Sequence, residues 1–244
     1  MLKIARGWFA QAPWLSLITS CCAIGLALGV KEFYSNANAT QLLWILAPSA
    51  WLARFVGGMD LVYEPGAGFI SHSYRMVVGP PCAGINFLVI CFLTLYFSFG
   101  RRVPRKAQWL LVAVILSFGA TILVNGLRIV VTAHLWNEDI YGGWMTPERM
   151  HRLAGTAIYY ASLLAVYVVV NSRFSTKGQP SAVPFAPLFW YLGISLGVPL
   201  AGRIVAGGSA GFVEHAAWVA GIALVLSLFM FLPPLLRNRV FWRP

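Results

Sequence analysis

The feature that most constrains this chain is a series of seven apolar stretches separated by short polar connections. They cover residues 13–30, 41–56, 83–99, 107–136, 151–170, 188–205 and 212–232. A helix needs about 20 mostly apolar residues to cross a hydrocarbon core about 30 Å thick. Charged residues make up 10% of the 244 residues, and no polar stretch is long enough to bury a core of its own. The sequence therefore predicts an all-α multi-pass membrane protein with six to seven transmembrane helices in a single domain, 1–244.

The second stretch, residues 41–56, is the poorest candidate for a full crossing because Pro48 and Arg54 interrupt it. Lys3 and Arg6 place the N-terminus in the cytoplasm, and two full crossings would return the connection at 57–81 to the same side. We therefore expect residues 41–56 to be re-entrant or interfacial. The alternative is an N-terminus on the outer side.

The first stretch also resembles a signal peptide, with small residues at 37–39 that could form a cleavage site. Because so many spans follow, we expect an uncleaved first helix.

Basic residues gather in some connections and are missing from others. The connections at 101–106, 171–184 and 233–244 are basic, which predicts a cytoplasmic location for them. The connections at 57–81, 137–150 and 206–211 would then face outward. All seven acidic residues fall on or beside that outward side: Glu32, Asp60, Glu64, Glu138, Asp139, Glu148 and Glu214. The net charge of +11 thus fits the positive-inside pattern of a membrane protein rather than nucleic-acid binding, and we expect a cytoplasmic (inner) membrane location.

The connection at 57–81 is the longest polar one and precedes the third apolar stretch. Residues 61–63 and 74–78 read as two short strands around a turn at 64–68, which predicts a small outward β-hairpin. His72 lies in this connection and is a candidate for lining a substrate cleft.

Three chemically reactive side chains converge on the same outer membrane face. Cys82 begins the third span, His151 begins the fifth, and Arg128 lies about 32 Å along the fourth, near the far side of the bilayer. A cysteine nucleophile needs a base, and an oxyanion needs a cation or hydrogen-bond donors. Asn125, one turn before Arg128, could hold the guanidinium. The simpler interpretation of each residue is a packing cysteine, an arginine that reaches the headgroups and an interfacial histidine.

Three short runs that contain these residues resemble the motifs of the exosortase/archaeosortase family. They are Cys82-Ala83-Gly84-Ile85, then Asn125-Gly126-Leu127-Arg128-Ile129, then His151-Arg152-Leu153-Ala154-Gly155. The family has the runs C-[SA]-G-[IL], N-x-x-R-[IV] and H-x-x-x-G, each beside a membrane span. The resemblance covers residues 57–170, and the chain is similar to a compact member such as exosortase K. Ala83 stands where many members have Ser, which leaves the nucleophile untouched.

The resemblance implies a cysteine-dependent membrane transpeptidase or protease without a cofactor or metal. Its substrates would be proteins with a C-terminal sorting signal, namely a motif such as Pro-Glu-Pro, an apolar helix and a basic end. Cys82 would form an acyl-enzyme thioester, His151 would act as general acid and base, and Arg128 would stabilise the thiolate or the oxyanion. Asn125, Gly84 and Gly155 would support the site. An acceptor nucleophile or water would then resolve the thioester at the extracytoplasmic face.

Other functional classes remain open. A transporter would use Arg128 and His151 as a polar pathway and would predict inverted repeats, of which the sequence gives no sign. A non-catalytic scaffold that binds a partner's helix would tolerate Cys82→Ser. The run at 207–211 matches G-x-S-x-G, but it joins two spans and so reads as a turn. His134, and His215 beside Glu214, lack partner spacing for a metal site.

Overall fold

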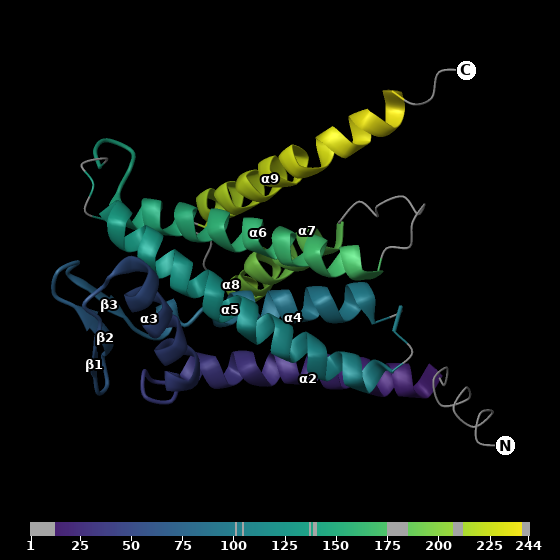
Figure 1. Ribbon diagram of the computed structural model, residues 1–244, viewed down its shortest axis with the longest axis horizontal. Coiled ribbons are helices and arrows are strands. Elements are labelled where there is room, and N and C mark those ends of the chain that lie inside the picture. Colours follow the sequence, from purple (N-terminus) through teal and green to yellow (C-terminus); the bar gives the residue numbers. More distant parts are fainter. Residues whose placement is uncertain are drawn as a thin grey trace. The chain divides into compact units, whose positions relative to one another are not determined.

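The computed structural model describes residues 13–100, 102–103, 105–136, 138, 141–174, 185–206 and 212–240. These residues are mostly helical, with one small antiparallel sheet (Figure 1). Six segments of the described chain are long and apolar enough to cross a membrane: Trp14–Asn36, Pro80–Phe99, Lys106–Trp136, Pro147–Phe174, Phe185–Arg203 and Phe212–Met230. The multi-pass helical class predicted from the sequence is confirmed.

The second apolar stretch, residues 41–56, forms α3 (Leu43–Gly57), which has 15 residues. At 1.5 Å per residue it is about 22 Å long, which is shorter than a hydrocarbon core of about 30 Å. Pro48 lies inside this helix, and Arg54 lies in its last turn. The described part of the chain therefore has six long candidate spans and one short apolar helix.

The chain divides into two compact units, residues 1–151 and 152–244, and the division falls within helix α6 (Pro147–Phe174). This helix is continuous across the division. The single-domain organisation predicted from the sequence stays a prediction. The residues proposed for chemistry, up to and including His151, belong to the first unit.

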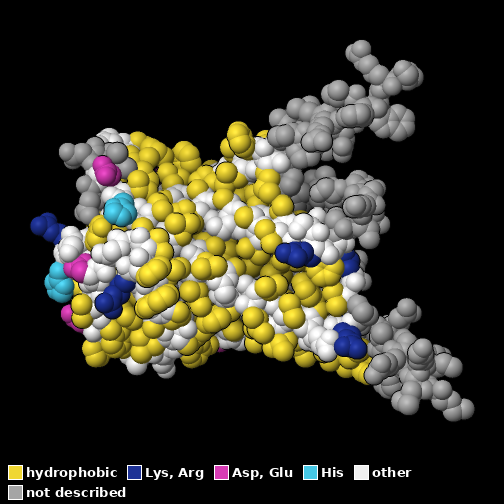
Figure 2. Space-filling model, in the orientation of Figure 1, with side chains coloured by type: hydrophobic (Ala, Val, Ile, Leu, Met, Phe, Trp, Pro, Cys, Tyr) yellow, Lys and Arg dark blue, Asp and Glu magenta, His cyan; other side chains and the backbone are white. Residues whose placement is uncertain are grey.

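Helix α4 (Ile85–Phe99) is the centre of the first unit. Within its candidate span 72% of the residues are buried, against 17% for α2 (Pro13–Asn36) and 33% for α5 (Lys106–Trp136). Both α2 and α5 pack against α4 (Figure 1). They expose large apolar side chains such as Leu28 and Leu123, and Figure 2 shows apolar side chains covering much of this face. Such surfaces suit contact with lipid chains rather than with water.

Glycines bring α3 and α5 close together. A Cβ added at Gly126 would lie 2.7 Å from Leu52 Cδ2, and one added at Gly57 would lie 2.8 Å from Val130 Cγ2. Small residues allow helix backbones to approach closely. This packing holds α3 against the half of α5 that carries Arg128.

The sheet contains strands β1 (Val62–Glu64), β2 (Gly68–Ser71) and β3 (Met76–Val78), all antiparallel, in the order β1-β2-β3. The sequence predicted a hairpin of two strands, at 61–63 and 74–78. The structure corrects this prediction, because both strands pair with β2, which lies between them. The sequence did not predict β2 because the strand begins with Gly68, and glycine is depleted in strands. It is required there because its φ is +115° and a Cβ would lie 2.5 Å from the Val78 carbonyl oxygen.

Asp60 holds the turn between β2 and β3. Its carboxylate accepts hydrogen bonds from the Ser71 hydroxyl, from the backbone N–H groups of His72 (3.2 Å) and Ser73 (3.0 Å), and from the Ser73 hydroxyl (2.8 Å). The Ser71 hydroxyl and the Ser73 donors together hold the pKa of Asp60 well below its usual range. The turn is thus tied to an ionised carboxylate.

The second unit contains the rest of α6, α7 (Phe185–Leu192), the π-helical turn η2 (Gly193–Gly197), α8 (Val198–Ala206) and α9 (Phe212–Val240). Tyr160 on α6 lies 2.5 Å from the Ser227 hydroxyl on α9, and its ring lies 4.8 Å from that of Tyr191 on α7. Arg203 stacks over the Phe212 ring at 5.4 Å. The G-x-S-x-G run at 207–211 lies outside the described residues.

Candidate active site

Cys82 lies at the end of a 3-10 turn, η1 (Pro80–Cys82), between β3 and α4. Two prolines fix φ in this turn. The Cys82 N–H donates to the Gly79 carbonyl at 2.8 Å, and the Ala83 N–H donates to the Pro80 carbonyl at 3.0 Å. The thiol side chain is partly exposed. A rigid turn therefore presents a reachable thiol immediately before a membrane helix.

Gly84 joins this turn to α4 with a φ of +73°, which favours glycine. A Cβ at this position would lie 3.1 Å from Asn125 Cγ and 3.2 Å from Thr121 Cγ2. Glycine is therefore needed both for the backbone conformation and for the close approach of the turn to α5.

Asn125 connects α5 to the cysteine turn. Its side chain is fully buried, and its Nδ2 donates to the Cys82 carbonyl at 2.6 Å. The sequence did not predict this contact. The predicted support of the Arg128 guanidinium by Asn125 stays a prediction.

Arg128 and His151 are in direct contact. Arg128 is 8% exposed, and its Nη2 lies 2.6 Å from His151 Nε2. A guanidinium can donate hydrogen bonds but cannot accept them. His151 Nε2 must therefore accept, which makes the imidazole neutral with its proton on Nδ1. A neutral imidazole is the form of histidine that can act as a base.

His151 lies in the second turn of α6, not at its beginning as the sequence predicted. The helix begins at Pro147, and the Thr146 hydroxyl accepts the Arg149 N–H at 3.3 Å. Threonine followed by proline and then by Glu148 is typical of a helix N-terminus, with a side-chain cap, a fixed φ and an acid in the first turn. These capping residues precede the apolar stretch at 151–170, so hydropathy alone places the start of the helix too late.

The structure brings Cys82 and Arg128 close enough to interact electrostatically, and Arg128 interacts with His151 in the same way. The three side chains come from η1, α5 and α6. Residues far apart in the sequence thus form one cluster within the first unit.

Tyr34, which the sequence analysis missed, also belongs to this cluster. Its hydroxyl donates to the Pro80 carbonyl at 3.3 Å, and the residue interacts electrostatically with Cys82 and Arg128. The sequence indicated a polar connection after residue 30, but α2 continues to Asn36. No sequence pattern links a tyrosine at a helix end to a turn 46 residues later.

Two other candidates lie apart from these contacts. His72 is exposed, and its backbone N–H is bound to Asp60. Among the described residues, no hydrogen bond or ring contact joins its imidazole to Cys82 or Arg128. Gly155 is buried one turn after His151 on α6. The described part of the chain contains no group of three or more His, Cys, Asp or Glu residues that could hold a metal ion.

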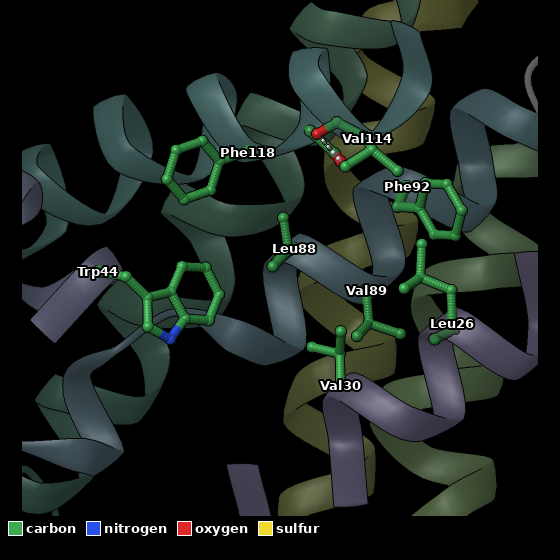
Figure 3. Close-up of a pocket in the computed structure, with 10 residues that line it drawn as sticks. Leu26, Val30, Trp44, Leu88, Val89, Phe92, Val114 and Phe118 are labelled. Carbon is green, nitrogen blue, oxygen red and sulfur yellow. Dashed lines mark hydrogen bonds between the residues drawn. The ribbon is translucent and has the colours of Figure 1, made fainter. Parts of the chain in front are cut away.

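An apolar cavity of about 160 Å³ lies among α2, α3, α4 and α5, and shares α2 and α5 with the cluster (Figure 3). Its lining includes Val30 of α2, Trp44 of α3, Leu88 of α4 and Phe118 of α5. Leu88 follows Cys82 by six residues, so the cavity begins within about two helical turns of the cysteine. An apolar cavity of about this size can hold a small ring or a branched apolar group.

The fold and this cluster define a multi-pass membrane protein with a cysteine, an arginine and a neutral histidine at one end of its first unit. The chain matches no protein-family model, and comparisons with curated proteins and with solved structures give no match either.

Proposed function

We propose that this chain is a membrane-embedded cysteine transpeptidase or peptidase that cleaves C-terminal sorting signals. The observation that carries the proposal is the Arg128–His151 contact beside the cysteine turn, which supplies a neutral imidazole and a buried cation together. The order of the three motifs in the sequence, which resembles that of exosortases, supports the same reaction class.

The proposed reaction has two halves. In the first, Arg128 moves away from His151 Nε2, and this nitrogen takes the proton from Cys82 Sγ. The sulfur then attacks the scissile carbonyl carbon. The carbonyl electron pair moves onto oxygen, and the Arg128 guanidinium stabilises the resulting oxyanion. The intermediate collapses to a thioester, the C–N bond breaks, and His151 returns its proton to the leaving amine.

In the second half, an acceptor amine or water attacks the thioester carbonyl and loses a proton to His151. Collapse of this intermediate breaks the S–C bond and restores the Cys82 thiol. No cofactor is needed for either half, because every proton moves between substrate, acceptor and the side chains of this chain.

We place the site on the extracytoplasmic face of a cytoplasmic membrane. We take α3 as too short to cross and the N-terminus as cytoplasmic. Six crossings would then leave Cys82 and the sheet outside, with the basic connections in the cytoplasm. Figure 2 shows acidic, histidine and basic side chains together at the sheet end of the first unit, so the orientation rests on the basic connections and not on this end. The substrate's apolar helix would then lie in the bilayer beside the enzyme.

A trapping experiment tests the proposal. The full chain is reconstituted in lipid vesicles with a protein that ends in a Pro-Glu-Pro motif, an apolar helix and a basic tail. Intact-protein mass spectrometry is expected to find an acyl adduct on Cys82. Cys82→Ala should abolish both adduct and cleavage, whereas Cys21→Ser, at an exposed position on α2, should change neither.

The same experiment separates the rival classes. A scaffold or a transporter would bind or move its ligand equally well with Cys82→Ser, whereas the proposed enzyme would lose turnover. Substrate cleavage that persists in Cys82→Ala would rule out this nucleophile.

A further inference from the structure

We propose that Tyr34 is a positioning residue that holds the Cys82 turn in place, an inference that rests on the proposed function of Cys82 as the nucleophile. The Tyr34 hydroxyl donates to the Pro80 carbonyl at 3.3 Å. The same carbonyl accepts the Ala83 N–H at 3.0 Å, which closes the turn around the cysteine. Tyr34 therefore acts on the turn and not on the reacting atoms.

Two helices hold this one turn through two side chains. Tyr34 from α2 binds the Pro80 carbonyl, and Asn125 from α5 binds the Cys82 carbonyl at 2.6 Å. Between these carbonyls the chain passes through Pro81, where φ is fixed. With both ends held and little rotation left between them, the two helices fix the backbone from which the Cys82 side chain projects.

A second contact keeps this end of α2 in register with α4. Lys31 Nζ lies 2.6 Å from Asn86 Oδ1, in the first turn of α4, and 5.5 Å from the centroid of the Tyr34 ring. Residues three apart share a helix face. Lys31 and Tyr34 therefore approach α4 and its preceding turn from the same side of α2.

Holding the turn through Tyr34 and Asn125 affects the charge environment of the Cys82 thiol. Arg128 interacts with both Cys82 and Tyr34, so the cation, the thiol and the hydroxyl lie in one neighbourhood. A nearby cation favours the reactive thiolate. If Tyr34 keeps the thiol close to Arg128, its loss should lower the thiolate fraction at neutral pH.

Tyr34→Phe tests the proposal, because it removes the hydroxyl and keeps the ring. The measurement is the rate constant for alkylation of Cys82 by iodoacetamide against pH, in the full chain in lipid nanodiscs with Cys21, Cys22 and Cys91 replaced by Ala. We expect alkylation at pH 7 to slow about three- to fivefold, as loss of one hydrogen bond allows. The midpoint of the pH profile should move to higher pH.

Tyr63→Phe is the matched control. It removes a hydroxyl that lies 3.1 Å from the Thr40 hydroxyl, outside the cluster. This variant is expected to keep the original profile. A purely structural role for Tyr34 would lower the yield of folded protein without moving the midpoint, so an unchanged midpoint in Tyr34→Phe overturns the proposal.

A second variant covers the case in which Tyr34→Phe does not fold. Lys31→Met frees the same end of α2 from Asn86 and should move the midpoint in the same direction by a smaller amount; an unchanged profile again overturns the proposal. Alkylation needs no substrate, so a chain that cleaves no sorting signal can still show this coupling. Failure of the proposed function is therefore distinguishable from failure of this inference.

Discussion

The contact between Arg128 and His151 sets a condition on any chemistry at this site. While the guanidinium donates to Nε2, that nitrogen cannot take a proton. His151 can therefore act as a base towards the thiol after Arg128 has turned away. A guanidinium has five donors in a planar fork, so Arg128 can exchange this contact for one to an oxyanion. Substrate binding would then release the base and supply the oxyanion with a partner in one movement.

This argument makes Arg128→Lys an informative change. An ammonium keeps the charge but cannot form a forked contact, so we expect cleavage of a sorting-signal substrate to fall by about 10²- to 10³-fold. Single-turnover kinetics in vesicles measures the loss. Arg149→Lys is the control, because Arg149 donates to the Trp144 carbonyl at 2.7 Å, outside the cluster. Near-normal turnover in Arg128→Lys would reduce Arg128 to a general positive charge.

The sequence could name Cys82, Arg128 and His151 because each is a chemically unusual residue at the end of an apolar stretch. It could not name the partners of the cysteine turn. Asn125 and Tyr34 both bind backbone carbonyls, and a carbonyl carries no sequence signature. The neutral form of His151 likewise follows from a contact between two helices, which no sequence spacing specifies.

At the scale of elements, the apolar stretches located the helices but not their ends. Helices α2 and α5 have 24 and 31 residues, which makes them about 36 and 46 Å long. Both exceed a hydrocarbon core of about 30 Å. Helix α2 continues beyond the apolar stretch at 13–30 to Asn36, and this added end carries Tyr34. Helix α5 matches its apolar stretch to within one residue and carries Arg128 inside it. The length of an apolar stretch reflects the thickness of the bilayer. The residue at which a helix begins depends instead on capping residues such as Thr146.

The sheet depends on pH through Asp60, an exposed carboxylate. Its pKa is lowered in the folded chain, so its stabilising effect is present above the unfolded pKa of about 3.9 and is lost as the pH falls below it. We expect hydrogen-exchange protection of the His72 and Ser73 amides, corrected for intrinsic rates, to fall below about pH 4. Asp60→Asn should lower this protection already at pH 7 and remove most of its pH dependence.

Glu64→Gln is the control for the sheet, because Glu64 is an exposed acid of β1 outside the Asp60 turn. It should leave the protection of these two amides unchanged at every pH. Protection that stays constant in the unmodified protein between pH 7 and pH 3 would contradict the role of Asp60.

At the scale of the whole molecule, the number of crossings decides which face carries the site. The sequence alone left two solutions, a second stretch that does not cross or an N-terminus outside. The length of α3, about 22 Å, favours the first solution. Six crossings from an inner N-terminus would put every basic connection on the cytoplasmic side, as the positive-inside rule predicts.

Reporter fusions test this topology in the whole protein. An enzyme that is active only outside the cytoplasm should work when inserted in the turn that precedes Gly68, between β1 and β2, or at Gly143, between α5 and α6, and should fail at Val103, between α4 and α5. A cytoplasm-active reporter at the same three positions is the control and should give the opposite pattern. The physical reason is the basic cluster around Val103, since moving several positive charges across the membrane is unfavourable. If the insertions before Gly68 and at Gly143 report a cytoplasmic location, Cys82 lies on the cytoplasmic face, and a sorting signal presented outside could not reach it.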